Sequence, residues 1–424
     1  MSRINSFLQV PPSNEFPLNN VPVGMAKFRG RSEKFACTRI GDFVIRLDVL
    51  ESSGLLRLPL TADDSVFATS SLKAFVSSGP AVWQHFRSSI QGIFGEGSSL
   101  AGDDRVSHCV RPVSDVDITM PMEIGAFTDF YSSKHHAANL GRILRGNDNP
   151  LQPNWLHLPV AYDARASSVV VSGTPLRRPR GQIRPTPEAS PEFAPTRKLD
   201  AELELGAIIG IANSLGAPVP IEKSLSHVFG FVLLNDWSAR DIQSWEYQPL
   251  GPFLGKSFCT TISPWIIMTE ALDPFRRPVG VQEPQPLPYL FTRPDYLFDI
   301  ELEMGLKTPT MNDFEAVCQT NALNLYWTIA QQIAHHTSNG CNLQVGDLLG
   351  SGTISGTEQG QLGSFMENSW NGTRDVMLTN GERRRFLLDG DEVRLSGRCR
   401  GSDYIIGFGD ASGKLLAPIE PVGS

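Results

Sequence analysis

Residues 199–206 read LDAELELG, and acidic and apolar side chains alternate along this segment. Successive side chains of a β-strand point to opposite faces, so the period of two predicts a strand with Glu202 and Glu204 on one face. Two interpretations fit this pattern. The acidic face is either solvated, or it forms a cation site, because two carboxylates about 7 Å apart on one face can direct oxygens at a single hard cation.

The composition of the whole chain also favours β-structure. The 424 residues include 38 glycines and 31 prolines, which together make up about 16% of the chain. The average share of these two residues is roughly 12%, so the excess indicates many turns. Hydrophobic residues make up 41% of the chain and charged residues 19%, whereas a disordered chain would be less apolar and more charged. At roughly 150 residues per domain, the length predicts two or three folded domains.

Charge and cysteine spacing argue against several classes of protein. The net charge is −8, without the basic excess that is typical of nucleic-acid-binding proteins. The six cysteines are widely scattered, which argues against zinc ribbons and a disulfide framework. The N-terminal segment lacks the apolar region of a secretory signal, and no apolar run approaches the roughly 18 residues of a membrane span. We therefore expect a cytoplasmic protein that binds neither nucleic acid nor membranes.

The density of turn residues changes near Val116, which predicts an N-terminal module at residues 1–115 and a larger, mostly β domain at residues 116–424. Within the module, strand-like runs at residues 35–39 and 43–50 predict a hairpin, and apolar spacing predicts a helix at residues 81–94.

Four further elements are expected in the larger domain. The proline-rich segments 181–200 and 273–294 are predicted to be loops. Apolar side chains at helical spacing predict a helix at residues 321–336. Short apolar runs on either side of Asp389-Gly390-Asp391 predict a hairpin that pairs residues 386–388 with 392–396.

A polar stripe follows the apolar run at residues 229–234. Asp236 stands at the end of this predicted buried strand, a position that suits either a functional carboxylate or a helix cap. On a helix, the spacing i, i+4, i+7 and i+11 would place four polar side chains on one face: Asp236, Arg240, Gln243 and Tyr247. A solvated face, with Trp237, Ile242 and Trp245 turned toward the core, is the alternative interpretation.

A third cluster lies in FTDFYSSKHH at residues 127–136, which contains Asp129, Tyr131, His135 and His136. A lone histidine is more often structural than catalytic, and the pair His335-His336 fits that ordinary class. An all-oxygen site suits Mg²⁺, Ca²⁺ or Mn²⁺ rather than zinc, and its candidate ligands are Asp129, Glu202, Glu204 and Asp236.

Long stretches of the chain resemble the fumarylacetoacetate hydrolase family. Two of these stretches are FTDFYSSKHHAANLGRILRG at residues 127–146 and LNDWSARDIQSWEYQPLGPFLGKSFCTTISPW at residues 234–265. Others are residues 149–182, 199–206, 341–356 and 386–399. The resemblance covers nearly all of residues 116–408 and is weaker in the N-terminal module.

The resemblance implies a mainly β fold with some helices, built from a small SH3-like N-terminal barrel and a large mixed β-roll catalytic domain that assembles as a homodimer. It implies a hydrolase that uses Mg²⁺ or Ca²⁺ to cleave the carbon–carbon bond of 4-fumarylacetoacetate, a diketo diacid. The products would be fumarate and acetoacetate, formed in the breakdown of tyrosine and phenylalanine.

The resemblance also implies roles for individual residues. The metal ligands would be Asp129, Glu202, Glu204 and Asp236, with Lys256 and Thr260 beside the cation. His136 would be the general base, oriented by Glu367. Charge developing in the reaction would be stabilised by Arg240, Gln243 and Lys256. The substrate contacts would be Tyr131, Arg145, Tyr162, Gln243, Tyr247 and Thr353.

Some residues near these positions depart from the family pattern. Asp163-Ala164 replaces His-Gly, Ile143-Leu144 replaces Met-Phe, Arg142 replaces an apolar residue and Cys259 replaces glycine. These departures leave open a related enzyme of specialised metabolism that acts on another β-dicarbonyl compound. A third interpretation, a scaffold protein that keeps the fold, predicts the loss of His136, Glu367 or a carboxylate, and all of these are present.

Overall fold

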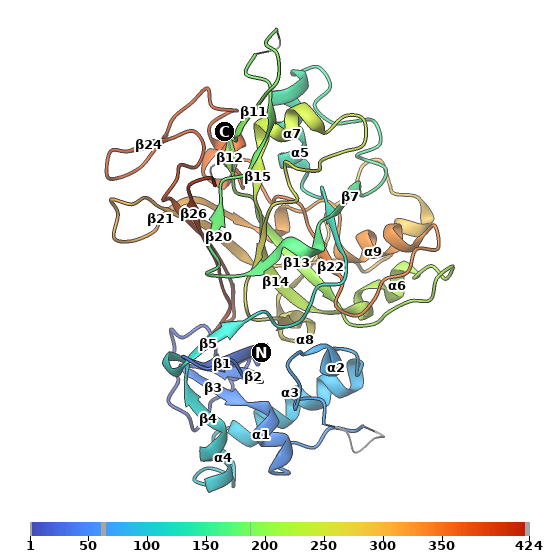
Figure 1. Ribbon diagram of the computed structural model, residues 1–424. Coiled ribbons are helices and arrows are strands. Elements are labelled where there is room, and N and C mark those ends of the chain that lie inside the picture. The colour runs from blue at the N-terminus through green and yellow to red at the C-terminus, as the bar shows by residue number, and fades with distance from the viewer. Residues whose placement is uncertain (1, 61–64, 187, 420–424) are drawn as a thin grey trace.

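The structure is a computed structural model, and it describes residues 2–60, 65–186 and 188–419. A small N-terminal part lies below a larger part in Figure 1. The predicted fold class is confirmed: the chain is mainly β with some helices, and a small β module precedes a large mixed β part. Within the described ranges, no helix has the length and apolar character needed to cross a membrane.

The N-terminal part is built on a five-stranded antiparallel sheet in the order β4-β3-β2-β1-β5. Its strands are β1 (Val23–Phe28), β2 (Lys34–Ile40), β3 (Phe43–Arg46), β4 (Val110–Pro112) and β5 (Val116–Thr119). β2 and β3 form the predicted hairpin. The expected second strand is too long, because helix α1 (Leu47–Ser52) follows β3 at once. Leu47 and Leu50 are both buried, and a spacing of three puts two residues on one face of a helix but on opposite faces of a strand.

The N-terminal sheet extends past the predicted domain boundary. β5 begins at Val116 and pairs with β1 from Met25 to Phe28. A strand that completes a sheet belongs to that sheet, so we propose that the N-terminal part ends after β5 rather than at residue 115.

Helix α3 (Pro80–Phe94) confirms the predicted helix and joins the two parts of the chain. Pro80 occupies its first turn, where the missing N–H costs nothing. The buried face carries Trp83, whose ring meets Phe229 of the larger part edge-on at 5.1 Å between centroids. Val23 and Ile266 add two backbone hydrogen bonds between the parts. Among the described residues below 125, the other α-helices are α1, α2 (Lys73–Val76) and α4 (Asp104–Cys109).

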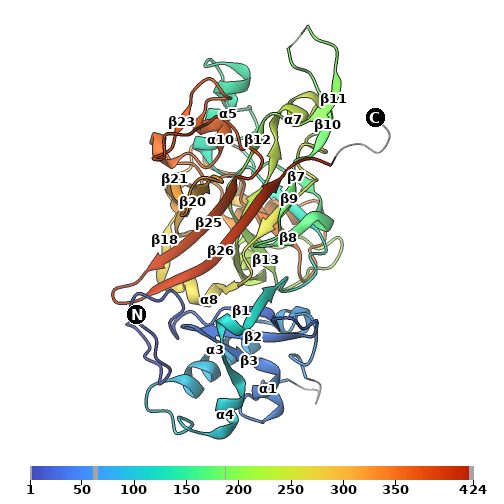
Figure 2. The same ribbon diagram turned by 60° about the vertical axis from the view of Figure 1, so that its left-hand side comes forward.

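The larger part consists of two main sheets that pack face to face. The eight-stranded sheet runs β7 (Ala161–Ala164), β6 (Phe127–Phe130), β22 (Leu348–Gly350), β13 (Leu203–Ile209), β14 (Val228–Asp236), β16 (Thr260–Ile262) and β8 (Val169–Val171), with β17 (Ile267–Met268) beside β14. The five-stranded sheet runs β21 (Glu315–Asn321), β20 (Glu301–Lys307), β25 (Glu392–Arg400), β26 (Ile405–Leu416) and β9 (Leu176–Arg177). Figure 2 shows β25 and β26 crossing the molecule as one long hairpin.

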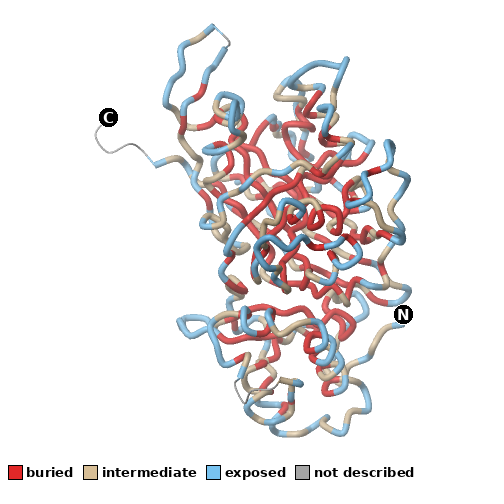
Figure 3. The backbone as a smooth tube through the Cα atoms, turned by 90° about the vertical axis from the view of Figure 1, so that its right-hand side faces the viewer, coloured by how far each residue is buried: buried red, intermediate tan, exposed pale blue. Residues whose placement is uncertain are grey.

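The space between these sheets holds the larger of the hydrophobic cores. Gly397 lies opposite Leu233, and a Cβ at that position would come within 2.8 Å of the leucine Cδ2. The glycine therefore lets the two sheets approach closely. Figure 3 shows buried segments filling the middle of the larger part, whereas the projecting loops are exposed.

Three predicted elements of the larger part are wrong. The helix expected at residues 321–336 is shortened to α9 (Ile329–Thr337), because β21 runs to Asn321 and Thr328 caps the helix by accepting from the Gln331 N–H. Residues 386–388 form no strand, since the Leu387 N–H donates to the Leu199 carbonyl and β25 pairs with β26 instead.

The third difference is a hairpin where a loop was predicted. Within residues 181–200, β10 (Arg180–Ile183) pairs with β11 (Glu192–Pro195) and projects from the larger part (Figure 2). Pro195 is the last residue of β11, and Pro185 and Pro191 lie outside both strands, so the missing N–H groups of these three break no ladder. Residues 273–294 are mostly irregular, as expected, apart from β18 (Arg276–Pro278) and two short 3₁₀ turns.

Replacement of Trp83 by alanine tests the contact between the two parts. Trp83 is 2% exposed, so we expect the free energy of unfolding to fall by about 3–5 kcal/mol, measured by urea denaturation with circular dichroism. Leu215→Ala, at a side chain that is 80% exposed, is the control and should stay within about 0.5 kcal/mol of the unmodified protein. Equal stabilities for the two variants would contradict the proposed coupling.

Candidate active site

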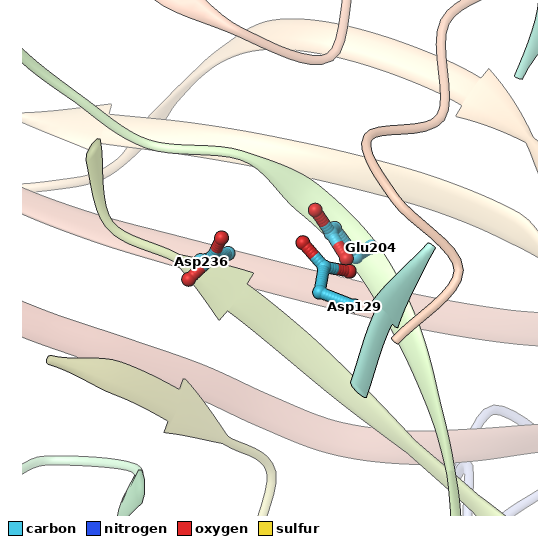
Figure 4. A group of neighbouring side chains, drawn as sticks. All are labelled: Asp129, Glu204 and Asp236. Carbon is cyan, nitrogen blue, oxygen red and sulfur yellow. The ribbon is translucent and has the colours of Figure 1, made fainter. Parts of the chain in front are cut away.

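Three strands near the centre of the eight-stranded sheet bring an acidic cluster together. Asp129 lies on β6, Glu204 on β13, and Asp236 is the last residue of β14. One carboxylate oxygen from each lies within 4.8 Å of the others. Figure 4 shows the three side chains pointing toward one another from their separate strands. The predicted strand pattern at residues 199–206 is therefore correct for Glu204, whose carboxylate faces the cluster and not solvent.

The acidic cluster is buried and short of hydrogen-bond donors. Its three side chains are at most 3% exposed, and Asp129 Oδ1 and Glu204 Oε1 have no hydrogen-bond partner among the described residues. Burial first, and then the neighbouring carboxylates, hold the pKa values of Asp129 and Glu204 well above the usual range. Unpaired buried oxygens are costly, and carboxylate oxygens are the donors that hard divalent cations prefer. The cluster could therefore hold a metal ion.

Gly350 of β22 leaves the space beside this cluster free. β22 lies between β6 and β13, and Gly350 is paired with Asp129 on one side and Gly206 on the other. A Cβ at Gly350 would lie 2.4 Å from Asp129 Oδ1 and 3.2 Å from Glu204 Oε2. Two residues later, the Gly352 N–H donates to Glu204 Oε2 at 3.0 Å.

Glu202 lies outside the three-carboxylate group, although the sequence analysis placed it with the other ligands. Its Oε1 accepts from Arg240 and its Oε2 accepts from Lys256. Burial alone would raise the pKa of Glu202, but the two cations outweigh that effect and lower it. Both oxygens of Glu202 therefore serve positively charged side chains in this structure.

Lys256 connects Glu202 to the acidic cluster. Its Nζ also donates to Asp236 Oδ2 at 2.6 Å, and the same carboxylate accepts from Tyr162 Oη at 2.9 Å and Thr260 Oγ1 at 3.1 Å. Burial alone would lower the pKa of Lys256, but the negative charges of Asp236 and Glu202 outweigh burial and raise the pKa above its usual value. The ammonium group therefore stays charged within the site. These contacts bring together predicted site residues that are far apart in the sequence, namely Tyr162, Glu202, Asp236, Lys256 and Thr260.

A histidine–carboxylate pair lies next to this network. His136 is on helix α5 (Lys134–Arg145), and its Nδ1 is 2.6 Å from Oε2 of Glu367 on helix α10 (Phe365–Asn368). Ser355 and Ser364 donate to the same oxygen at 2.9 and 2.8 Å. The ring edge at Nε2 faces Glu202 Oε1 at 3.9 Å. The carboxylate thus fixes which imidazole nitrogen faces the acidic groups.

The two neighbouring histidines both lie on helix α5 but are buried to different extents. Adjacent residues on a helix are about 100° apart, so His136 is 2% exposed and His135 is half-buried. Burial, followed by Lys134, lowers the pKa of His135.

Arg240 begins helix α7 (Arg240–Glu246), so the predicted four-residue stripe is not one helical face. Asp236 still belongs to β14, and β15 (Ser238–Ala239) separates it from the helix. Arg240 is nevertheless central, because its Nη1 donates to Gln243 Oε1 at 3.2 Å while its other nitrogens bind carboxylates. Trp237 and Ile242 are buried, as the alternative interpretation expected, whereas Trp245 is partly exposed.

The predicted substrate contacts are divided between the site and the surface. The Tyr131 ring meets the His136 ring edge-on at 5.3 Å between centroids. Thr353 follows Gly352 and is buried, with no hydrogen-bond partner for its hydroxyl among the described residues. Arg145 is exposed and donates to the Pro150 carbonyl at 2.7 Å, and Tyr247 is also exposed. These last two side chains have no contact with the acidic cluster in the structure.

The departures from the family pattern lie around this site. Ile143 packs in a small cluster with Tyr131, and Leu144 and Asp163 are exposed. Arg142 donates to Asn139 Oδ1 at 3.0 Å. Burial raises the pKa of the Cys259 thiol to about 12, so this cysteine adds no thiolate nucleophile.

Asp200, which is not among the predicted site residues, accepts from Arg240 Nε at 2.8 Å. The alternation that drew attention to Glu202 and Glu204 contained a signal for it. In LDAELELG, Asp200 precedes Glu202 by two residues and therefore shares its face of the extended chain.

Two family models match the chain. "Fumarylacetoacetase N-terminal" matches residues 19–121, and "Fumarylacetoacetate (FAA) hydrolase C-terminal" matches residues 125–414. The chain is 48% identical over 414 residues to a fumarylacetoacetase from Bos taurus, covering 97% of this chain and 98% of the relative. It is 46% identical over 419 residues to that of Homo sapiens, covering 98% of this chain and 100% of the relative.

Among solved structures, the fumarylacetoacetate hydrolase of Exiguobacterium antarcticum has the same fold. It matches with a TM-score of 0.54 and 17% identity, over 94% of this chain and 99% of the other.

Gly350→Ala tests the cation site without removing a carboxylate. The new methyl group would lie 2.4 Å from Asp129 Oδ1, so we expect calorimetric titration with Mg²⁺ or Ca²⁺ to show binding lost or weakened at least about tenfold. Gly360→Ala is the matched control, because a Cβ there meets nothing within 4 Å. Unchanged affinity in the Gly350 variant would place the cation elsewhere.

Proposed function

This chain belongs to the fumarylacetoacetate hydrolase family, and we propose that it hydrolyses the carbon–carbon bond of 4-fumarylacetoacetate to fumarate and acetoacetate. The reaction is a step in the breakdown of tyrosine and phenylalanine. The observation that carries the proposal is the placement of a buried His136–Glu367 pair beside a buried acidic cluster. Hydrolysis of a β-diketone requires both a base for water and a means to hold the carbanion that departs.

His136 is proposed to activate the water. Its Nδ1 is engaged by Glu367, so Nε2 is the nitrogen that would take a proton from water as the oxygen attacks the substrate carbonyl. The carboxylate keeps the neutral imidazole in the required tautomer and stabilises the imidazolium that forms. As the tetrahedral intermediate collapses, the carbon–carbon bond breaks and its electron pair passes to the acetoacetate fragment as an enolate. A proton returned to that carbon completes the reaction.

The acidic cluster is proposed to hold Mg²⁺ or Ca²⁺. Asp129, Glu204 and Asp236 would supply the oxygens, with Lys256 and Thr260 at the border of the site. When bound, such an ion supplies Lewis-acid stabilisation of negative oxygen. Glu202 stays a predicted fourth ligand, and in the structure its oxygens hold Arg240 and Lys256.

Charge on the departing enolate is proposed to be met by Arg240, Gln243 and Lys256. Arg240 and Lys256 are fixed by buried carboxylates, so they need little reorganisation when negative charge develops. Tyr131, Tyr162 and Thr353 are proposed to contact the substrate beside them. Arg145 and Tyr247 are proposed to bind its outer carboxylate end, since a guanidinium pairs well with a carboxylate.

We further propose that the chain works in the cytoplasm as a homodimer. Large apolar side chains are exposed in one segment at and after α7, and such a patch is typical of interaction surfaces. They are Trp245, Tyr247, Leu250, Phe253 and Leu254. Light scattering of the purified chain tests the assembly.

Turnover of 4-fumarylacetoacetate with and without a chelator tests the proposed reaction. We expect hydrolysis with Mg²⁺ or Ca²⁺, loss of activity in chelator and recovery when the ion is restored, because the acidic cluster would lose its counter-charge. Negligible cleavage of this substrate alongside efficient cleavage of another 2,4-diketo acid would instead favour the alternative activity on a different β-dicarbonyl compound. Failure on every diketone would contradict the enzymatic assignment.

His136→Ala tests the proposed base, with His135→Ala as its neighbour control. Loss of the base should lower kcat by about 10²–10⁴-fold, measured in steady state on fumarylacetoacetate. His135 is half-buried, and among the described residues Glu367 is hydrogen-bonded to His136 and not to His135, so replacement of His135 should have a small effect. A larger loss for His135→Ala than for His136→Ala would reverse the assignment.

A further inference from the structure

A buried carboxylate that the proposed reaction does not use lies next to the site. Asp200 is the second residue of strand β12 (Leu199–Asp200), which pairs with β15, and its side chain has no exposed surface. A buried carboxylate is retained only where its charge and hydrogen bonds are satisfied. The partners that satisfy Asp200 therefore indicate what it does.

Asp200 accepts four hydrogen bonds. Its Oδ2 accepts from Arg240 Nε at 2.8 Å and from the Met366 N–H at 3.1 Å. Its Oδ1 accepts from the Phe365 N–H at 2.6 Å and from the Ala201 N–H at 2.8 Å. A carboxylate offers about four lone-pair sites for hydrogen bonds. All four sites of Asp200 are therefore filled, by Arg240 of α7, by the first two N–H groups of α10 and by the N–H of the following residue, Ala201.

Asp200 joins helices α7 and α10, which hold residues with two different proposed roles: stabilising the enolate and activating the water. Arg240 opens α7 and also donates to Glu202. Phe365 and Met366 form the first turn of α10, whose next residue is Glu367, the partner of His136. Asp200 thus contacts the proposed enolate stabiliser, Arg240, directly and reaches the proposed base, His136, through α10 and Glu367.

We propose that Asp200 is a positioning residue that sets the place of the Arg240 guanidinium relative to the His136 imidazole, which it reaches through α10 and Glu367. This inference rests on the proposed function for the roles of Arg240 and His136. Removing the charge at Asp200 would free Arg240 Nε and leave the first N–H groups of α10 with a weaker acceptor. Both groups would then move relative to the reacting atoms, and displacements of about 1 Å can cost 10²-fold in rate.

Asp391 provides a matched control. It is 1% exposed, and it holds Arg384 by two hydrogen bonds of 2.8 and 2.9 Å while accepting from the Leu388 N–H at 2.8 Å. Its charge, burial and guanidinium partner match those of Asp200, but none of its hydrogen bonds reaches the site. Any loss that comes only from breaking a buried aspartate–arginine pair will affect both positions.

The test compares Asp200→Asn with Asp391→Asn in the full chain. We expect kcat on fumarylacetoacetate to fall by about 10²-fold in the Asp200 variant with little change in KM, because positioning acts on the transition state. Asp391→Asn should keep kcat close to that of the unmodified protein even if its melting temperature falls. The second readout is the NMR signal of the His136 Nδ1 proton in protein with isotope-labelled histidine, which should move only in the Asp200 variant.

Asp200→Glu keeps the inference testable if Asp200→Asn does not fold. Glutamate retains the charge opposite Arg240 but displaces the carboxylate by one methylene, so kcat should still fall and the His136 signal should still move. Wild-type kcat in either Asp200 variant, an equal loss in the Asp391 variant, or an unmoved His136 signal would overturn the positioning role. The NMR readout requires no substrate, so it stands even if the unmodified chain does not hydrolyse fumarylacetoacetate, a result that would refute the proposed function alone.

Discussion

Buried negative charge is the constraint on which the site depends. Six carboxylates that are at most 3% exposed surround it: Asp129, Asp200, Glu202, Glu204, Asp236 and Glu367. Arg240 and Lys256 form ion pairs with three of the six, and His136 is paired with Glu367. Asp129 and Glu204 have no ion pair within the described part of the chain. Each buried ion costs several kcal/mol in lost hydration, so the imbalance is the physical argument for a divalent cation between these two and Asp236.

The eight-stranded sheet determines where the buried carboxylates without an ion pair lie. Neighbouring strands are about 4.8 Å apart. β13 is the neighbour of β14 and is separated from β6 by β22 alone, where glycine keeps the space open, so carboxylates on β6, β13 and β14 come close enough to share an ion. The positive groups come from outside the sheet. Arg240 opens a helix, and Lys256 lies in the turn that leads to β16. The sheet therefore holds the negative groups rigidly, and the segments after β14 supply the groups that balance them.

The local pattern of the sequence predicted the parts of the site that depend on local geometry. The alternation in residues 199–206 gave the correct strand for Glu204, and the position of Asp236 after an apolar run gave the correct strand end. Spacing could not assign Glu202 to Arg240 and Lys256, because those partners lie 38 and 54 residues away and meet it only in the folded chain. The error at residues 321–336 has the same origin, since pairing with β20 converts the first residue of that segment into strand.

The attachment of α3 to β14 has a consequence for the living cell. Phe229, which meets Trp83, and Asp236 lie on the same strand, so the described N-terminal residues support the acidic cluster without supplying a ligand to it. A substitution that weakens the Trp83–Phe229 contact would reduce the number of folded molecules without removing a group from the acidic cluster. Proteases and chaperones amplify such losses, because about 1–2 kcal/mol of destabilisation can change abundance several-fold. Loss of this contact would therefore show in cells as a smaller amount of folded protein.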